Sequence, residues 1–323
     1  MPMEHVTAGP LPTIADINAA ARRIENAVRT TPVLSEPTAN ELLGCELWLK
    51  CENLQRAGAF KFRGARNAVA RLDEIGRPGD VATHSSGNHG AALALAAASR
   101  GRRAWVVMPE NSVKTKIDSV RRYGGEVIFC KPTPEGREAG LARLVENGCV
   151  PVHPYDYADI ICGQGTAAVE FMQQRNDLDV LLTPVGGGGL ISGTAIAASA
   201  LNPAIAVIGA EPQGAADTAL SLEQGKRVTR FPVDTIADGL RAIVGVMNFR
   251  IIQDHVEHVL TVSEAAIIEA MAFAWVHYRL LIEPSSATVI AAIREHGEHF
   301  EGRRVGAIIS GGNVELTQLP FKP

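Results

Sequence analysis

One lysine stands in a setting that favours covalent chemistry with carbonyl compounds. The sequence contains seven lysines, and Lys61 is flanked by Phe60 and Phe62, after a glycine-containing turn and before a helical pattern. An amine in an apolar pocket loses its charge more easily, which makes it a better nucleophile toward a carbonyl carbon. A surface lysine whose stem packs on apolar neighbours would show the same local pattern. Taken alone, this segment leaves both interpretations of Lys61 open.

Two loops have the composition of anion-binding sites. Residues 84–90, His-Ser-Ser-Gly-Asn-His-Gly, follow an apolar strand pattern and precede an alanine-rich helical pattern at 91–98. Backbone N–H groups at such a helix start attract an anion, so this loop suits a substrate carboxylate. Residues 184–190 contain four consecutive glycines, which let the backbone wrap closely around a phosphate. A capped turn and a tight turn are the simpler alternatives for the two loops.

A third segment has two carboxylates that could bind a hard cation. Glu211 and Asp217 lie six positions apart with backbone carbonyls between them, and oxygen atoms are the ligands that such cations prefer. An ordinary acidic loop is the other interpretation, and spacing alone favours it. Weaker metal candidates, which we expect on the surface, are two histidine pairs: His255 with His258, and His296 with His299.

Strand and helix patterns alternate along most of the chain and predict an α/β fold. The strand candidates are residues 47–51, 104–108 and 127–130, together with the continuous apolar runs at residues 180–183, 205–210 and 305–309. Such runs indicate strands covered on both faces, and strands separated by helices indicate a mainly parallel sheet. Ligands of these sheets bind beyond the carboxyl ends of the strands. Both glycine-containing loops fall at such positions, as does Ser310, whose hydroxyl follows the last apolar run.

Composition argues for an ordinary folded protein. The chain has 323 residues, of which 46% are hydrophobic and 20% charged, and its net charge of −4 predicts no partner among nucleic acids or anionic membranes. Residues 180–210 carry no charge, but Pro184, Pro203 and the glycines rule out one helix across a bilayer. Five cysteines without a Cys-x-x-Cys spacing are expected to be reduced. Without a recognisable secretory signal, these features predict a cytoplasmic location.

Together these segments resemble the fold type II pyridoxal-phosphate enzymes, and among them the serine/threonine dehydratase and serine racemase family. The resemblance runs from Thr30 to Val314 and includes further stretches at residues 50–55, 163–166, 237–239 and 282–285. It implies two open, mainly parallel sheets flanked by helices. It also implies a large cofactor-binding domain of residues 1–78 and 157–323, with a small mobile domain of residues 79–156 inserted in it. A homodimer is implied as well.

The resemblance implies a role for each segment. Lys61 would hold pyridoxal phosphate covalently and act as base and acid, and Ser86 would deliver a proton on the opposite face. Further cofactor contacts would come from Phe60, Asn88, Gly186, Gly187, Gly188, Gly189, Gly239, Glu283 and Ser310. The substrate would meet Ser85, Ser86, Asn88, His89 and Arg137. A divalent cation (Mg²⁺, Mn²⁺ or Ca²⁺) would bind Glu211, the carbonyl of Ala215, and Asp217.

The implied reaction converts a β-hydroxy amino acid of the serine/threonine class to a 2-oxo acid and ammonia. The alternatives are a serine racemase with dehydratase side activity, and a 3-hydroxyaspartate dehydratase in which Arg137 or Arg241 binds the second carboxylate. Tyr155 stands where animal serine racemases have asparagine, which argues against a pure racemase. The glycine loop alone would also permit a non-catalytic ligand-binding protein on this scaffold, against which Lys61 and Ser86 argue.

Overall fold

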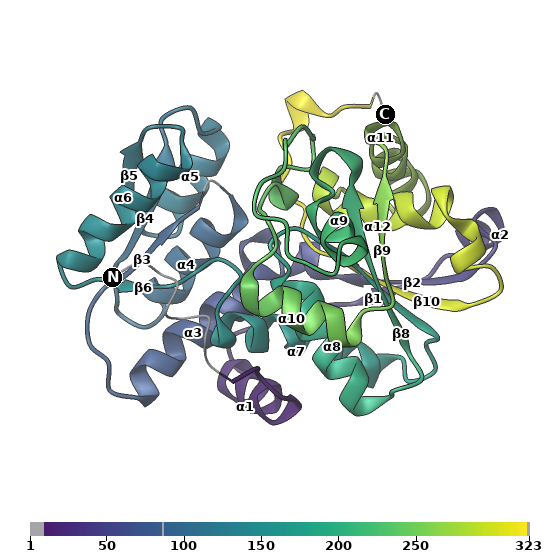
Figure 1. Cartoon of the computed structure of the whole chain (residues 1–323), viewed down its shortest axis with the longest axis horizontal. Helices are drawn as coiled ribbons and strands as arrows, with labels where there is room; N and C mark the ends of the chain where they lie inside the picture. Colours follow the sequence, from purple (N-terminus) through teal and green to yellow (C-terminus); the bar gives the residue numbers. More distant parts are fainter. Residues whose placement is uncertain (1–9, 86, 322–323) are drawn as a thin grey trace.

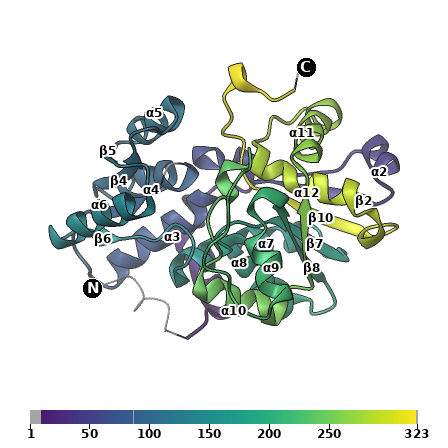
Figure 2. The same cartoon turned by 45° about the horizontal axis from the view of Figure 1, so that its top comes forward.

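The computed structural model describes residues 10–85 and 87–321, whose strands form two separate sheets. Figure 1 shows the smaller sheet on the left and the larger on the right, and the separation persists after the 45° turn of Figure 2. The larger sheet has the strand order β1-β2-β10-β7-β8-β9, and the smaller has the order β5-β4-β3-β6. The predicted α/β fold with two mainly parallel sheets is confirmed.

The larger sheet is parallel except at one edge. Its strands are β1 (Val33–Leu34), β2 (Glu46–Cys51), β7 (Val180–Pro184), β8 (Ala206–Pro212), β9 (His258–Val262) and β10 (Arg304–Ile309). Only β1 runs antiparallel, beside β2. Neighbouring side chains of one strand enter opposite cores: Leu181 packs in one hydrophobic cluster, and Leu182 packs in the other. Both faces are therefore buried, as the continuous apolar runs predicted.

Helices cover both faces of the larger sheet. One face is covered by α1 (Ile14–Ile24), α7 (Ala158–Gln174), α8 (Gly189–Leu201) and α10 (Val246–His255). The other is covered by α11 (Glu264–Phe273) and α12 (Pro284–Glu295). The remaining elements of this part are α2 (Pro37–Leu43), α9 (Asp217–Glu223), the π-helical turn η6 (Ala274–Tyr278), and the 3₁₀ turns η2 (Glu52–Leu54), η3 (Arg56–Gly58), η4 (Gln213–Ala215), η5 (Asp238–Leu240), η7 (Gly297–His299) and η8 (Leu316–Gln318).

The smaller sheet draws all its strands from residues 81–151. It consists of β3 (Val81–His84), β4 (Ala104–Pro109), β5 (Gly125–Cys130) and β6 (Val150–Pro151), with α4 (Asn88–Ala98), α5 (Lys114–Arg122) and α6 (Pro134–Glu146) packed on it. This range falls inside the predicted small domain, whose boundaries and mobility stay predictions. Residues 127–130 form the predicted strand as part of β5, but Phe129 is 46% exposed, because β5 is an edge strand.

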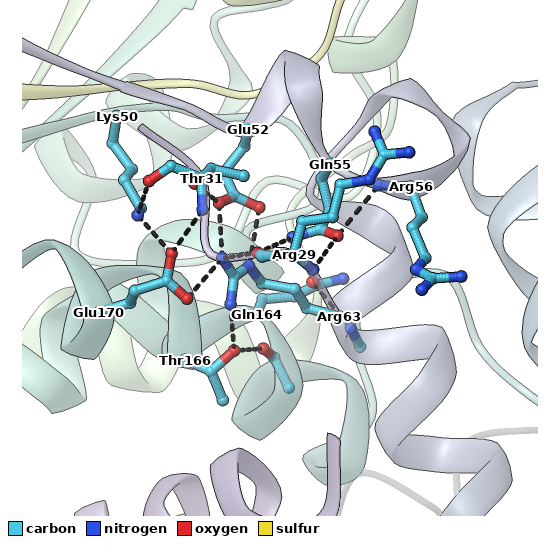
Figure 3. Close-up of polar contacts among 12 residues, drawn as sticks. Arg29, Thr31, Lys50, Glu52, Gln55, Arg56, Arg63, Gln164, Thr166 and Glu170 are labelled. Atoms are coloured by element: carbon cyan, nitrogen blue, oxygen red, sulfur yellow. Dashed lines mark hydrogen bonds and ion pairs between the residues drawn. The ribbon is translucent and has the colours of Figure 1, made fainter. Parts of the chain in front are cut away.

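Helix α3 (Lys61–Glu74) joins the two parts, because it packs against both α7 and α4. A cluster of four buried or nearly buried charges fixes its first turn (Figure 3). The Arg63 guanidinium donates two hydrogen bonds to Glu52 at 2.8 Å each and a third to Glu170 at 3.0 Å. Glu170 also accepts from the Lys50 ammonium, whose second acceptor is the carbonyl of Thr31. Two positive and two negative groups thus compensate one another away from water.

The uncharged run predicted to form a strand, a glycine loop, a helix and a strand does so as β7, the loop, α8 and β8. Within the part of the chain that the structure describes, no helix combines the length and apolarity needed to cross a membrane.

Candidate active site

A cavity of about 810 Å³ is lined by loops of both sheets. Most of the residues predicted to meet the cofactor or substrate line it: Phe60, Lys61, Ser85, Asn88, His89, Arg137, Gly186, Gly187, Gly188, Gly189, Gly239, Glu283 and Ser310. Ser86 lies outside the described residues. Glu211, Ala215 and Asp217 do not line this cavity. The fold thus gathers segments far apart in the sequence, and the role of each residue stays a prediction.

Lys61 is the first residue of α3 and presents its amine to the cavity. The Nζ atom donates to the carbonyl of Pro154 at 3.0 Å and lies 5.1 Å from the centre of the Phe60 ring. Burial lowers the pKa of Lys61 to about 8, against the opposing effect of the Glu283 carboxylate. Roughly a tenth of the amine is then uncharged at pH 7, far more than for a lysine in water. Such an amine can act as nucleophile and as base.

The glycine loop at residues 186–189 fits a phosphate group. A side chain on Gly187 would overlap the ring of Tyr155, with the nearest ring atom at 2.3 Å. The carbonyl of Gly187 accepts from the side chain of Asn248 at 2.7 Å, so this acceptor already has a partner within the protein. Helix α8 begins at Gly189, so its first backbone N–H groups face the loop. Free N–H donors at a helix start are the donor set that a phosphate needs.

Asn88, the first residue of α4, and Glu283, which precedes α12, meet in the cavity wall. The Asn88 side chain donates to both carboxylate oxygens of Glu283, at 2.8 and 3.1 Å. Burial raises the pKa of Glu283, and the hydrogen bond from Asn88 opposes that change. Nearby, the Ser85 hydroxyl oxygen accepts from the backbone N–H groups of Gly87 and Gly90. Ser85 therefore caps the turn before α4 as well as lining the cavity.

Two histidines of this wall are uncharged. Burial lowers the pKa of His84 to about 4, with a smaller contribution from Arg137, and it lowers the pKa of His89 well below its usual value. The Nε2 atom of His89 faces the carbonyl of Val152 at 3.4 Å, and since a carbonyl only accepts, that nitrogen carries the proton. A substrate carboxylate at the start of α4 would therefore be held by backbone N–H groups and not by a charged His89.

Ser310 follows β10 and presents a neutral hydroxyl to the cavity. Its Oγ atom lies 2.9 Å from the Oγ atom of Ser286. The Ser286 hydroxyl also donates to the carbonyl of Gly311 at 2.7 Å and accepts from the Gly311 N–H. Ser286 thus fixes the position of Ser310, and the group that the cavity offers at this point is a hydroxyl and not a carboxylate.

The predicted cation ligands form a separate buried site. One carboxylate oxygen of Glu211 accepts from the N–H of Ala219, and the other is buried without a partner among the described residues. Burial raises the pKa of Glu211 to about 8 and that of Asp217 to about 6. No set of three or more acidic, histidine or cysteine side chains is placed to hold a metal in the described residues. A cation between these two carboxylates would therefore also need backbone carbonyls such as that of Ala215.

Sequence reasoning missed an ion pair in the cavity wall. Lys116 of α5 pairs with Asp238 of η5, and both residues line the cavity. The pair joins an element of the smaller sheet to one of the larger part. Lys116 has the local pattern of an ordinary surface lysine on an amphipathic helix, so only its place in the fold distinguishes it. His84 was missed as a separate candidate, although it opens the loop at residues 84–90.

Comparison with known proteins identifies the family to which the chain belongs. Residues 24–311 match the family described as pyridoxal-phosphate dependent enzyme. The chain belongs to this family. It is 47% identical to serine racemase of Dictyostelium discoideum and 44% identical to β-hydroxyaspartate dehydratase of Paracoccus denitrificans, over 95% and 96% of the chain and 96% and 99% of those proteins. The structure of maize serine racemase matches with a TM-score of 0.93 at 41% identity, covering 96% of each chain. These matches confirm the predicted family and fold.

The lowered pKa of Lys61 predicts how attachment of the cofactor depends on pH. Only the uncharged amine attacks the cofactor's aldehyde, so the rate of attachment should rise with pH up to about 8 and level off above it. An ordinary lysine would give a rise continuing to about 10.4. The measurement is the growth of visible absorbance after cofactor-free protein is mixed with pyridoxal phosphate between pH 6 and 10. A rate still increasing in proportion to hydroxide above pH 9 would contradict the lowered pKa.

Proposed function

We propose that this pyridoxal-phosphate-dependent protein is a dehydratase that converts a β-hydroxy-α-amino acid of the serine/threonine class to a 2-oxo acid and ammonia. The main support is one cavity that contains the Lys61 amine, the glycine loop at residues 186–189 and the start of α4. These features offer a base, a phosphate site and a carboxylate site. The substrate loses one water and then takes up one water as ammonia leaves, so the net products are the 2-oxo acid and ammonia.

The proposed roles follow from the chemistry of each group. When bound, pyridoxal phosphate withdraws electrons from the substrate's α-carbon and so acidifies the α-proton. The uncharged amine of Lys61 removes that proton, while backbone N–H groups at the start of α4 hold the carboxylate. Ser310 would hold the cofactor's ring nitrogen through a neutral hydroxyl and not a carboxylate, so no negative charge would keep that nitrogen protonated, and loss of the β-hydroxyl would then be favoured. A proton delivered by Ser86 on the opposite face would give racemisation as a side reaction.

The test is release of 2-oxo acid from L-serine, D-serine and L-threonine, followed with a coupling dehydrogenase. Release from at least one of them, abolished by prior borohydride reduction, would support the proposal. A protein that binds the cofactor but turns over none of the β-hydroxy amino acids, including the hydroxyaspartates, would instead fit the non-catalytic alternative.

A second candidate substrate is 3-hydroxyaspartate, which one side chain favours. Arg137 of α6 lines the cavity, and its Nε atom is buried without a hydrogen-bond partner among the described residues. A guanidinium in this state can bind a second carboxylate through charge-assisted hydrogen bonds. Arg241, the other residue predicted for this role, already donates twice to the carbonyl of Thr235. Arg137 is therefore the better supported of the two.

Arg137→Met tests this substrate. We expect kcat/KM for L-threo-3-hydroxyaspartate to fall about 50-fold, the order expected when a charged hydrogen bond is lost. The value for L-serine, which has no second carboxylate, should change less than about threefold on the same reasoning. Arg143→Met is the matched control, because Arg143 lies exposed on the same helix and does not line the cavity. Equal losses for both substrates would assign Arg137 a role unrelated to the second carboxylate.

We also propose that Mg²⁺ binds between Glu211 and Asp217, supported by the partnerless buried oxygen of Glu211. Mg²⁺ at about 100 times its dissociation constant should raise the thermal midpoint by about 4–8 °C, and EDTA should reverse the rise. Glu211→Gln should abolish the rise, whereas Glu223→Gln, at an exposed position of α9, should preserve it. An unchanged midpoint with Mg²⁺, Mn²⁺ and Ca²⁺ would refute the site.

A cytoplasmic location and a homodimer complete the proposal. The location is supported by five cysteines without a disulfide, which suits a reducing compartment. The dimer rests on the family resemblance and is tested by light scattering, with twice the mass of one chain as the expected result.

A further inference from the structure

We propose that Asn313 is a positioning residue that fixes the orientation of the Asn88 side-chain amide. Asn313 follows β10 at the end of the segment 310–313 and is not part of the cavity lining. Its Nδ2 atom donates to the carbonyl of Ala57 and to Oδ1 of Asn88, each at 2.8 Å. The inference rests on the proposed function, because the contact between Asn88 and the cofactor is part of that proposal.

The backbone carbonyl of Ala57 sets the direction of every hydrogen bond in the series that links Ala57, Asn313, Asn88 and Glu283. A backbone carbonyl only accepts, so the Asn313 atom that faces Ala57 must be the NH₂ group. The second hydrogen of that group points at Asn88, and the atom it meets must be the Asn88 carbonyl oxygen. The NH₂ group of Asn88 is thereby directed at Glu283, whose two oxygens accept from it. Asparagine has two nearly isosteric amide orientations, and these contacts select one of them.

The acceptor at Ala57 is itself held in place. Ala57 and Gly58 have φ values of +57° and +72°. A residue with a Cβ atom adopts this left-handed conformation only where its surroundings hold it there. The carbonyl of Gly58 accepts from the N–H of Gly312 at 3.0 Å, which pairs the turn before Lys61 with the segment after β10. A side chain at Gly58 would also overlap Oδ1 of Asn313, at 2.3 Å. The turn therefore leaves room for Asn313 and presents a fixed acceptor to it.

The selected orientation is the one that a cofactor oxygen needs. One hydrogen of the Asn88 NH₂ group can serve both oxygens of Glu283, which leaves the other hydrogen for the ring oxygen of pyridoxal phosphate. In the opposite orientation the Asn88 carbonyl would face the Glu283 carboxylate and the cofactor oxygen, neither of which can donate to it when ionised. Asn313 therefore acts on the cofactor through Asn88.

The test is a double-mutant cycle on cofactor binding, with Asn313→Ala, Asn88→Ala and the double variant. We expect Asn313→Ala to raise the dissociation constant of pyridoxal phosphate about tenfold, the order expected for one lost hydrogen bond. In the Asn88→Ala background, Asn313→Ala should raise the dissociation constant by less than a further factor of about two, because the residue through which Asn313 acts is gone. The pH at which the visible absorbance of the bound cofactor changes should also rise in Asn313→Ala, since the NH₂ group of Asn88 is then no longer held toward the ring oxygen.

Additional variants keep the outcomes distinct. Asn313→Asp preserves shape and removes both donated bonds, so it should weaken binding at least as much as Asn313→Ala, and it replaces that variant if Asn313→Ala does not fold. Thr317→Ala, an exposed change in the same C-terminal segment, should leave binding unchanged. Wild-type affinity in both Asn313 variants, or additive losses in the cycle, would overturn the inference. An Asn88→Ala variant with wild-type affinity and spectrum would instead contradict the proposed role of Asn88.

Discussion

Lys61→Ala is expected to lower kcat for 2-oxo acid release by roughly 1,000-fold or more, because in the proposed function Lys61 is both the covalent link to the cofactor and the base. The amine at this position has its pKa lowered to about 8 by burial and points into the cavity. No other lysine among the described residues both lines the cavity and lacks an ion pair, because Lys116 is paired with Asp238. The measurements are the steady-state rate and the protein mass after borohydride reduction.

The mass measurement tests the covalent role proposed for Lys61 apart from its proposed role as a base. Reduction should fix one cofactor on the unsubstituted protein and none on Lys61→Ala. Lys114→Ala is the matched control, since Lys114 is an exposed residue of α5 outside the cavity, and it should keep both the rate and the mass increase. A Lys61→Ala protein that still acquires the cofactor mass and turns over substrate would place the covalent site elsewhere.

Arg63→Met should destabilise the protein by about 3–5 kcal/mol, the range measured when one partner of a buried ion pair is removed. Arg63 is 1% exposed, and its guanidinium is the shared partner of Glu52 and Glu170. Burial alone would raise the pKa of Glu52, but Arg63 holds that pKa below its usual value. Methionine would leave this buried carboxylate without its main counter-charge. The measurement is urea unfolding of the cofactor-free protein, with the free energy taken by linear extrapolation.

An exposed arginine provides the comparison for Arg63. The side chain of Arg103 is 69% exposed and pairs with Asp80, so Arg103→Met should cost no more than about 1 kcal/mol. The loss of stability in Arg63→Lys should lie between those of the two methionine variants, because an ammonium keeps the charge but cannot bond Glu52 through two parallel hydrogen bonds. If Arg63→Met lowers the free energy of unfolding as little as Arg103→Met does, water must solvate the charges that remain in the cluster.

Local patterns singled out four segments that line the cavity, and the family resemblance supplied the remaining predicted lining residues. Lys61, the glycine loop and Ser310 each follow a strand or turn and precede a helix or loop, and parallel sheets place such segments at one edge. What local patterns omit are the contacts between them. Asn313 and Asn88 are separated by 225 positions, and Lys116 meets Asp238 across the two parts of the fold. Pairs of this kind form only through tertiary packing, which periodicity and composition do not predict.

The partial exposure of one predicted strand has a related reason. The run at residues 127–130 is as apolar as those that became central strands. Whether a strand is central or at an edge depends on strand order, which a single run does not carry. Spacing also could not show how deeply the predicted cation ligands lie: it favoured an ordinary acidic loop, whereas Glu211 is 0% and Asp217 2% exposed. Glu211 lies near the end of β8 and Asp217 at the start of α9, so their burial comes from the packing of these two elements.

The order of strands in the larger sheet constrains when the protein can fold during synthesis. The smaller sheet needs only residues 81–151, so its contacts become available early and are comparatively local. The larger sheet has β10, its last strand in the sequence, between β2 and β7. Until residues 304–309 leave the ribosome, the sheet lacks its middle, and β2 has no parallel neighbour. Contacts of such long sequence separation form slowly. Since Ser310 directly follows β10, the cavity too is completed only after this last strand of the sheet has been synthesised.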